Sequence, residues 1–293
     1  MNKLGIFMNF WGKNWAADHA KYIKKAARIG YDVLEFQAQP LLEMSDEKLK
    51  SLKALADDEG IELTYSLGLD PNYDVSSLDE KVRLGGVEYL KNIIGQIEKM
   101  DGKLLSGVSY AGWGTPNCIL DDKSAYWNNS VKSMRSIIKT AEGCGITYCV
   151  EAVNRFETCL INTAAEALQY VAEIDSKNIG VLLDTYHMNI EENSIGDAIR
   201  LVGDKLASFH TGENNRTAPG RGHLNWDEIF KALADIRYDK RIVCEPFVMM
   251  GGEVGRDIHV FRDLIDDTSE SRIDEEAKYI LQFEQEMIRK YFR

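Results

Sequence analysis

Four residues of kinds that bind divalent metals stand at or just beyond the ends of four successive apolar runs. They are Glu151, Asp184, His210 and Glu245. Each run is short and continuous, which is typical of a strand buried on both faces of a parallel sheet. The carboxyl ends of parallel strands meet on one face, where α/β folds place their chemistry. We therefore expect the four side chains to converge.

Three converging carboxylates without a nearby lysine would repel one another unless a cation neutralised them. With one imidazole they form a mainly oxygen donor set, which suits Mn²⁺, Co²⁺ or Mg²⁺ better than a structural Zn²⁺. The pattern therefore predicts a divalent metal centre. The alternative is four polar residues that are each satisfied separately.

Further candidates follow these positions along the chain. The polar ones are Glu157, His187 and Arg216. Placed in loops at the same face, they could reach a bound ligand, although a solvated loop charge is the alternative for each. The aromatic ones are Trp15, Trp113 and Phe247. Together they suit a sugar-binding wall, or else a lid over an apolar core.

The apolar patterns predict eight strands, each followed by a helix. We expect strands at residues 4–8, 33–36, 61–67, 104–108, 148–153, 181–183, 206–209 and 242–244. We expect helices at residues 16–29, 45–59, 78–100, 124–142, 163–174, 195–202, 226–236 and 274–292. After the strand at 181–183, polar residues indicate a loop that leads into a helix start.

Strict alternation of strands and helices implies a parallel sheet, and eight such units in 293 residues have the size of a TIM (β/α)8 barrel. We therefore predict an α/β fold with a single-domain barrel over residues 1–293. An open doubly wound sheet is the competing fold. It would carry a G-x-G-x-x-G turn after an early strand, and the sequence has none.

The composition of the chain disfavours some classes of binding partner. The formal net charge of −12 argues against nucleic acids and anionic membranes. Five cysteines without a C-x-x-C pair indicate reduced thiols, and we expect Cys144, Cys149 and Cys244 to be buried. The chain begins without a signal-peptide pattern, and none of its apolar runs approaches about 18 residues. We therefore expect a cytoplasmic location.

Several sequence blocks resemble the ketose 3-epimerases, the D-tagatose 3-epimerase and D-psicose (allulose) 3-epimerase group of the sugar isomerase/epimerase TIM barrels. The blocks are NKLGIFMNFW (2–11), EAVNRFE (151–157), LLDTYHMNIEE (182–192), FHTGENNR (209–216), PGRG (219–222) and CEPFVMMGG (244–252). The resemblance runs over essentially the whole chain. The residues at Met8, Ser66 and Gly114 depart from the usual family pattern, which leaves the preferred ketose open.

The resemblance implies epimerisation at carbon 3 of free 2-ketoses, such as D-tagatose/D-sorbose, D-fructose/D-psicose or ribulose, through a cis-enediolate. It implies that Glu151 and Glu245 are the acid/base pair and that both ligate Mn²⁺, Co²⁺ or Mg²⁺ together with Asp184 and His210. The substrate would be held by Glu157, His187, Arg216, Trp15, Trp113, Phe7, Ser66 and Phe247. We also expect a homodimer or homotetramer.

Other functions stay open at this point. An aldose–ketose isomerase would use a similar enediolate but move the carbonyl to carbon 1, and a C-glycoside-cleaving relative would use the same proton abstraction. A sugar-binding protein without turnover would not need paired proton-transfer groups. We expect phosphorylated sugars to be poor substrates, with Arg216 and Arg221 as the strong cations near the mouth. The Gly251–Gly252 turn is the one feature that could bind phosphate.

Overall fold

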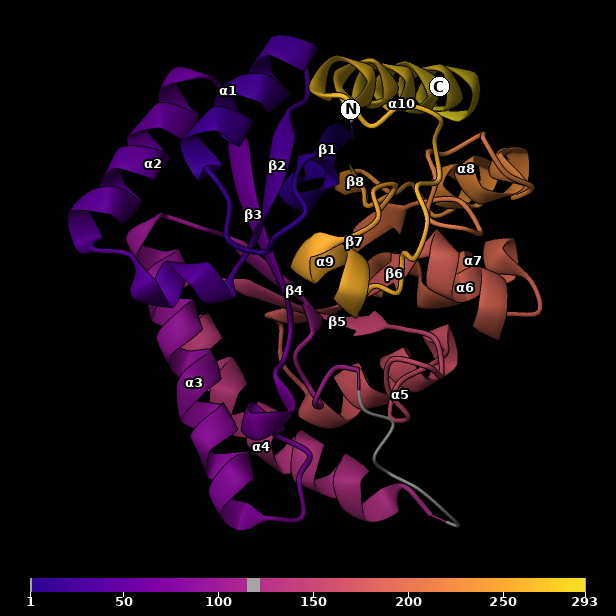
Figure 1. Cartoon of the computed structure of the whole chain (residues 1–293). Helices are drawn as coiled ribbons and strands as arrows, with labels where there is room; N and C mark the ends of the chain where they lie inside the picture. Colours follow the sequence, from indigo (N-terminus) through magenta and orange to yellow (C-terminus); the bar gives the residue numbers. More distant parts are fainter. Residues whose placement is uncertain (1, 115–121, 293) are drawn as a thin grey trace.

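Eight parallel strands close into a barrel in the computed structural model, which describes residues 2–114 and 122–292 (Figure 1). Each strand pairs with the next, and β8 returns to β1. The strands are β1 (Lys3–Phe7), β2 (Val33–Gln37), β3 (Glu62–Gly68), β4 (Leu104–Val108), β5 (Thr147–Ala152), β6 (Ile179–Asp184), β7 (Leu206–Thr211) and β8 (Arg241–Cys244). The prediction of an eight-stranded barrel is confirmed.

Helices surround the barrel, as Figure 1 shows. They are α1 (His19–Ile29), α2 (Asp46–Asp58), α3 (Glu80–Lys99), α4 (Ser124–Gly143), α5 (Ala164–Ile174), α6 (Thr185–Glu191), α7 (Ile195–Val202), α8 (Trp226–Asp235), α9 (Gly252–Asp257) and α10 (Glu270–Tyr291). Short 3-10 turns occur at Met8–Trp11, Gln39–Glu43, Pro71–Tyr73 and Gly203–Lys205. The apolar faces of the helices pack on the strands to form one large core.

Local sequence signals account for most helix boundaries. Ser45 caps α2 by accepting a hydrogen bond from the backbone N–H of Lys48. Thr163 forms a capping box with Glu166 at the start of α5. Within α3, Gly86 is required because a Cβ there would lie 1.9 Å from the carbonyl oxygen of Tyr73. Its presence inside the helix therefore reflects close packing rather than a break.

The structure corrects three sequence-based boundaries. The loop expected after residue 183 is absent, because β6 passes directly into α6 at Thr185. α1 begins at His19 rather than at residue 16, since Asp18 caps it. The short α9 was not predicted at all, because Gly251, Gly252 and Gly255 give it a turn-like sequence.

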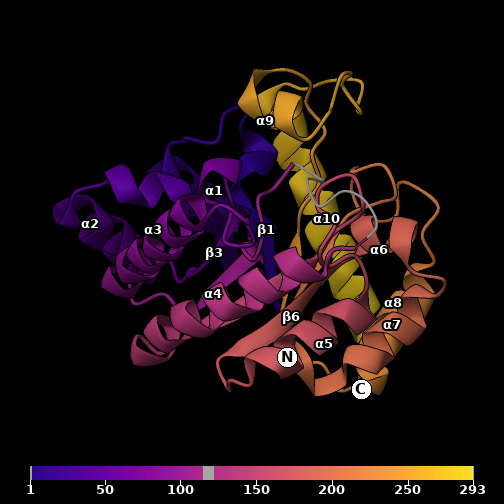
Figure 2. The same cartoon turned by 90° about the horizontal axis from the view of Figure 1, so that it is seen from below.

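The barrel has two distinct ends. Figure 2 shows α9 at one end and both chain termini at the other. The carboxyl ends of the strands lie at the α9 end, so side chains that close β5 to β8 are presented there. In the β6–β7 register Asp184 pairs with His210, and in the β7–β8 register His210 pairs with Val243. The parallel register therefore brings the predicted metal ligands to one level of the barrel.

The prediction of buried, reduced cysteines is confirmed for Cys149 and Cys244, whereas Cys144 is reduced but not fully buried. Cys159 is disulfide-bonded, so the expectation of reduced thiols does not extend to it. Cys118 lies outside the described residues. Within the described part of the chain, none of the helices has the length and apolar character needed to cross a membrane.

Candidate functional site

The four predicted metal ligands meet at the carboxyl ends of adjacent strands. Each offers one ligand atom, and these atoms all lie within 4.8 Å of one another. Glu151, Asp184 and His210 lie inside β5, β6 and β7, and Glu245 follows β8 directly. The first three are buried and Glu245 is half-buried. The prediction that these side chains converge is confirmed.

The donor set fits a divalent cation. Among the described residues, Glu151 Oε1 and His210 Nδ1 are buried atoms without a hydrogen-bond partner. Buried polar atoms almost always have a partner, so two such atoms facing one cluster of carboxylates indicate a missing ligand. Carboxylate oxygens with one imidazole nitrogen form a set suited to Mn²⁺, Co²⁺ or Mg²⁺.

Arg216 supplies positive charge to this cluster. Its Nη1 donates to Asp184 Oδ2 and to Glu245 Oε2, each at 3.1 Å. The guanidinium also stacks on Tyr186, 4.0 Å from the ring centroid. Arg216 has a positive φ of 64°, a conformation set by the tight turn in which its N–H donates to the Glu213 carbonyl. The buried guanidinium therefore neutralises part of the carboxylate charge.

The two glutamates of the cluster have opposite pKa shifts. Burial raises the pKa of Glu151 well above its usual value, and the negative charge of Glu245 adds to the effect. Burial also acts to raise the pKa of Glu245, but its contact with His210 and the charge of Arg216 outweigh burial, so the pKa of Glu245 is lowered. Burial raises the pKa of Asp184 to about 6 despite the opposing charge of Arg216. Glu151 therefore holds a proton more readily than Glu245 does.

A second group of polar residues borders the cluster. His187 Nε2 lies 3.2 Å from Arg216 Nη2 and 3.7 Å from Glu151 Oε1. Burial lowers the pKa of His187 well below its usual value, so its ring is neutral. Its Nδ1 accepts a hydrogen bond from the backbone N–H of Asn154 at 3.1 Å, and the guanidinium of Arg216, which can only donate, faces Nε2. Contacts at both ring nitrogens therefore fix the orientation of His187 at the edge of the site.

Glu157 joins this group from the loop after β5. Its Oε2 accepts a hydrogen bond from Trp113 Nε1 at 2.7 Å, and its Oε1 lies 3.8 Å from Arg216 Nη2. Burial raises its pKa, although Arg216 and the Trp113 hydrogen bond oppose the effect. Trp113 is therefore held in place by a residue that itself faces the site.

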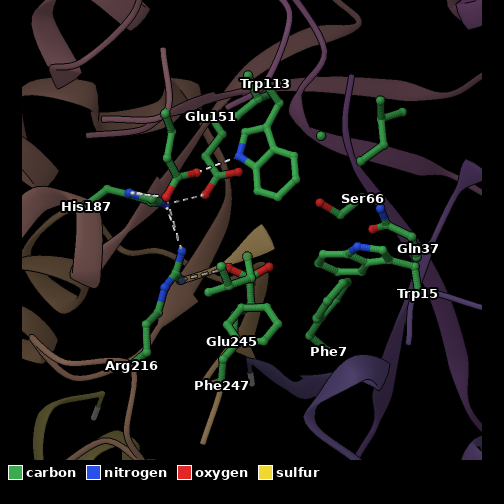
Figure 3. Close-up of a pocket in the computed structure, with 15 residues that line it drawn as sticks. Phe7, Trp15, Gln37, Ser66, Trp113, Glu151, His187, Arg216, Glu245 and Phe247 are labelled. Carbon is green, nitrogen blue, oxygen red and sulfur yellow. Dashed lines mark hydrogen bonds and ion pairs between the residues drawn. The ribbon is translucent and has the colours of Figure 1, made fainter. Parts of the chain in front are cut away.

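These residues line a pocket of about 440 Å³ (Figure 3). The lining residues are Phe7, Trp15, Gln37, Ser66, Leu67, Gly68, Val108, Trp113, Glu151, Glu157, His187, Arg216, Glu245, Phe247 and Ile258. All the predicted substrate-binding residues are among them. Asp184 and His210 are not lining residues and are fully buried.

Aromatic side chains form the wall of the pocket. Phe7 and Phe247 pack edge-to-face at 5.9 Å, and so do Trp15 and Trp113 at 6.2 Å. Trp15 Nε1 donates to Asp257 Oδ2 of α9 at 2.8 Å. The α9 segment thereby joins the loop after β1 over the mouth, which restricts access of water.

Two sequence-based placements are wrong. His187 is not in a loop but within α6, because the Asp184 side chain accepts the N–H of Tyr186 and starts the helix at once. Arg221 is not at the mouth: it pairs with Glu276 at 3.1 Å and stacks on Tyr279 of α10. Arg216 is thus the arginine that the described residues place in the pocket.

Three residues near the site were not predicted. Glu35 and Gln37 lie in β2 and alternate with apolar Leu34 and Phe36, which is the pattern of side chains that share one face of a strand. That alternation was the signal available in the sequence. Asn154 lies inside the EAVNRFE block, and its contacts with His187 could not be seen without the fold.

Comparison with known proteins agrees with this geometry. Residues 23–279 match the model of the xylose isomerase-like TIM barrel family. The chain is 44% identical over 281 residues to a D-psicose 3-epimerase of Ruminiclostridium cellulolyticum, covering 96% of each chain. It is 39% identical to a D-psicose 3-epimerase of Agrobacterium fabrum, over 96% of this chain and 97% of that one.

A solved structure is equally similar. The D-psicose 3-epimerase of Clostridium cellulolyticum H10, solved with D-tagatose, has a TM-score of 0.95 and 43% identity, covering 98% of this chain and 99% of that one. The region aligned with these relatives includes every element that supplies a pocket residue. The chain therefore belongs to the xylose isomerase-like TIM barrel family and, within it, to the ketose 3-epimerases, enzymes of the isomerase class.

Proposed function

We propose that this enzyme inverts carbon 3 of free 2-ketoses with the help of a divalent metal. Glu151 and Glu245 act as the acid/base pair through a cis-enediolate, and both ligate Mn²⁺ or Co²⁺, or alternatively Mg²⁺, together with Asp184 and His210. The observation that carries the proposal is the pair of glutamates brought to one pocket from β5 and from the end of β8, with opposite pKa shifts. Such a pair suits removal of a proton by one residue and its return by another.

Each residue has a separate task in this scheme. One of the two glutamates takes the carbon 3 proton on one face and the other supplies a proton to the opposite face; the reverse reaction exchanges the two roles. When bound, a divalent cation would supply Lewis acidity that stabilises the negative charge developing on the ketose oxygens by several kcal/mol. Each proton-transfer residue typically contributes about 10²- to 10⁴-fold in rate.

The remaining residues orient the sugar. Glu157, His187 and Arg216 border the two glutamates and would hold the oxygens at carbons 1 to 3. Phe7, Trp15, Trp113 and Phe247 would pack on the carbon-bound hydrogens and exclude water, while Ser66 would meet the far end. Exclusion of water strengthens the electrostatic interactions on which proton abstraction next to a carbonyl depends.

Free ketoses fit this pocket better than ketose phosphates. Arg216 is already engaged by Asp184 and Glu245, and Arg221 is engaged outside the pocket by Glu276. At the Gly251–Gly252 turn, the backbone N–H of Val254 donates to the Lys13 carbonyl and Glu253 adds negative charge. A phosphate group would therefore meet little free positive charge. The names of the D-psicose 3-epimerase relatives support D-fructose and D-psicose as one substrate pair, beside D-tagatose/D-sorbose and ribulose.

Turnover in heavy water tests the proposal. Incubation of D-fructose or D-tagatose with the Mn²⁺-loaded enzyme should give D-psicose or D-sorbose, with deuterium at carbon 3 of the product and the carbonyl still at carbon 2. An aldose–ketose isomerase would instead label carbon 1 or 2 and release aldoses. Faster turnover of a ketose phosphate would reject the preference for free sugars, and the lack of any turnover across a panel of 2-ketoses would favour a sugar-binding protein.

Two expectations accompany the proposal. We infer a homodimer or homotetramer, which sedimentation velocity of the purified chain can check. We also infer a cytoplasmic location, which fractionation of the source cells can check.

A further inference from the structure

One acidic side chain lies inside the barrel without belonging to the predicted site. Glu35 is in the middle of β2 and is fully buried. Its Oε1 lies 2.9 Å from Nε2 of His210, on the other side of the barrel. Its Oε2 accepts a hydrogen bond from Thr64 Oγ1 at 2.9 Å, and Thr64 is its direct partner in the β2–β3 register. Both carboxylate oxygens are therefore directed at specific groups.

Burial of a carboxylate is costly unless its contacts compensate, so a fully buried glutamate next to a metal ligand requires a physical reason. His210 has two ring nitrogens with different neighbours. Nε2 faces Glu35, whereas Nδ1 lies 3.8 Å from Oε2 of Glu245 and is directed at the cluster of ligands. A neutral imidazole carries its proton on one nitrogen only, and the group that faces that nitrogen decides which one.

We propose that Glu35 is a positioning residue: it holds the proton of His210 on Nε2 and thereby presents Nδ1 as the metal ligand, while Thr64 fixes the orientation of the Glu35 carboxylate. Carboxylate partners of ligating histidines fix both the tautomer and the ring orientation, and they increase the basicity of the ligand. The inference rests on the proposed metal dependence and extends it by assigning a role to β2 and β3.

The contact between Glu35 and His210 is short but not aligned. The Nε2–Oε1 separation is that of a hydrogen bond, but the ring is not turned so that the N–H points in line at the carboxylate. When a cation is bound, Glu35 would hold the ring with Nδ1 toward the ligand cluster. The role of Glu35 should therefore be measurable as a change in metal affinity.

The experiment uses three substitutions in the full chain. Glu35→Leu removes the acceptor at similar volume, Glu35→Gln keeps a carbonyl acceptor without charge, and Thr64→Val removes the donor to Glu35. Mn²⁺ binding to chelator-treated protein is measured by isothermal titration calorimetry. We expect Kd to rise about 10- to 100-fold for Glu35→Leu, and less for Glu35→Gln and Thr64→Val. Glu284→Gln is the matched control, because Glu284 is also a fully buried carboxylate but contacts Thr211 instead.

Imidazole nitrogen shifts in NMR spectra supply a readout that a purely structural role would not change. With Mg²⁺ bound, His210 should carry its proton on Nε2 in the wild-type protein and lose that preference in Glu35→Leu. Unchanged Mn²⁺ affinity in all three variants, with only a lower melting temperature, would overturn the inference. If Glu35→Leu does not fold, Glu35→Gln and Thr64→Val still decide it. Absence of Mn²⁺ and Co²⁺ binding by the wild-type protein would instead reject the metal dependence itself.

Discussion

The two ends of the pocket differ in charge. The end formed by β5 to β8 offers three carboxylates, an imidazole and a guanidinium, whereas the polar lining side chains at the β2 to β4 end are one amide and one hydroxyl, those of Gln37 and Ser66. Figure 3 shows the two groups on opposite sides of the pocket. In the charged half, Glu157, Glu245, His187 and Arg216 each have an ionic partner or a hydrogen bond to a neighbour. In the neutral half, the Gln37 and Ser66 side chains have no hydrogen-bond partner within the described part of the chain.

This difference assigns the reaction at carbon 3 to the charged half and the choice of substrate to the neutral half. Proton abstraction next to a carbonyl needs fixed charges with specific pKa values, so a change to one group of the charged half alters the others. The neutral half can contact a distant hydroxyl group of the sugar without entering that network. Substrate preference can therefore change at Gln37 and Ser66 while the reaction at carbon 3 is retained.

Removal of the metal should have the largest effect, because it affects all four ligands of the charged half. Treatment with a chelator should abolish epimerisation and lower the melting temperature, since a ligand that binds only the folded state stabilises it. Addition of Mn²⁺ or Co²⁺ should restore both. Full activity in a chelated sample shown by elemental analysis to lack metal would contradict the proposed site.

Substitution of the two glutamates should have the next largest effect. Glu151→Gln and Glu245→Gln should each lower kcat by at least about 100-fold, because a neutral amide cannot exchange the proton. Ketose binding, measured by calorimetry, should be retained in part. Glu88→Gln on the exposed face of α3 is the control and should leave kcat unchanged. A residue whose variant kept more than about a tenth of the wild-type rate would not be the acid or base.

Metal affinity should depend on pH in a defined direction. Asp184 has a pKa of about 6, and the pKa of Glu151 is also raised. A carboxyl group must lose its proton to ligate a cation, so affinity is full above these pKa values and is lost as pH falls through them. The Kd for Mn²⁺ should rise by at least about tenfold from pH 7.5 to pH 5. Gln37→Leu should show the same pH profile, and a flat wild-type profile would argue against ligation by these carboxyls.

Changes in the neutral half should have the smallest effect. Gln37→Leu and Ser66→Ala should leave kcat for D-fructose within about threefold but reduce the preference for D-fructose over 6-deoxy-D-fructose by about 2- to 10-fold, the value of one hydrogen bond. Competition kinetics with the two sugars measures this ratio. An unchanged ratio, or a loss of kcat comparable to that of Glu245→Gln, would remove the distinction between the two halves.

Much of the fold and half of the site follow from local sequence alone. Apolar runs of strand length alternate with amphipathic helices, and this pattern depends on each segment burying its own apolar face. Asp184 and His210 could be placed because they interrupt or end such runs, and the carboxyl ends of parallel strands always meet. The metal ligands could therefore be predicted from their positions at the ends of apolar runs in the sequence.

The remaining contacts of the site depend on closure of the barrel. Glu35 faces inward and its partner His210 lies across the barrel, and the direction of a side chain toward a distant strand depends on strand number and register rather than on neighbouring residues. Arg216 and Arg221 are five residues apart in the loop after β7, yet one lies among carboxylates and the other packs on α10. The opposite pKa shifts of Glu151 and Glu245 arise in the same way, because electrostatic interactions depend on distance in space and on burial.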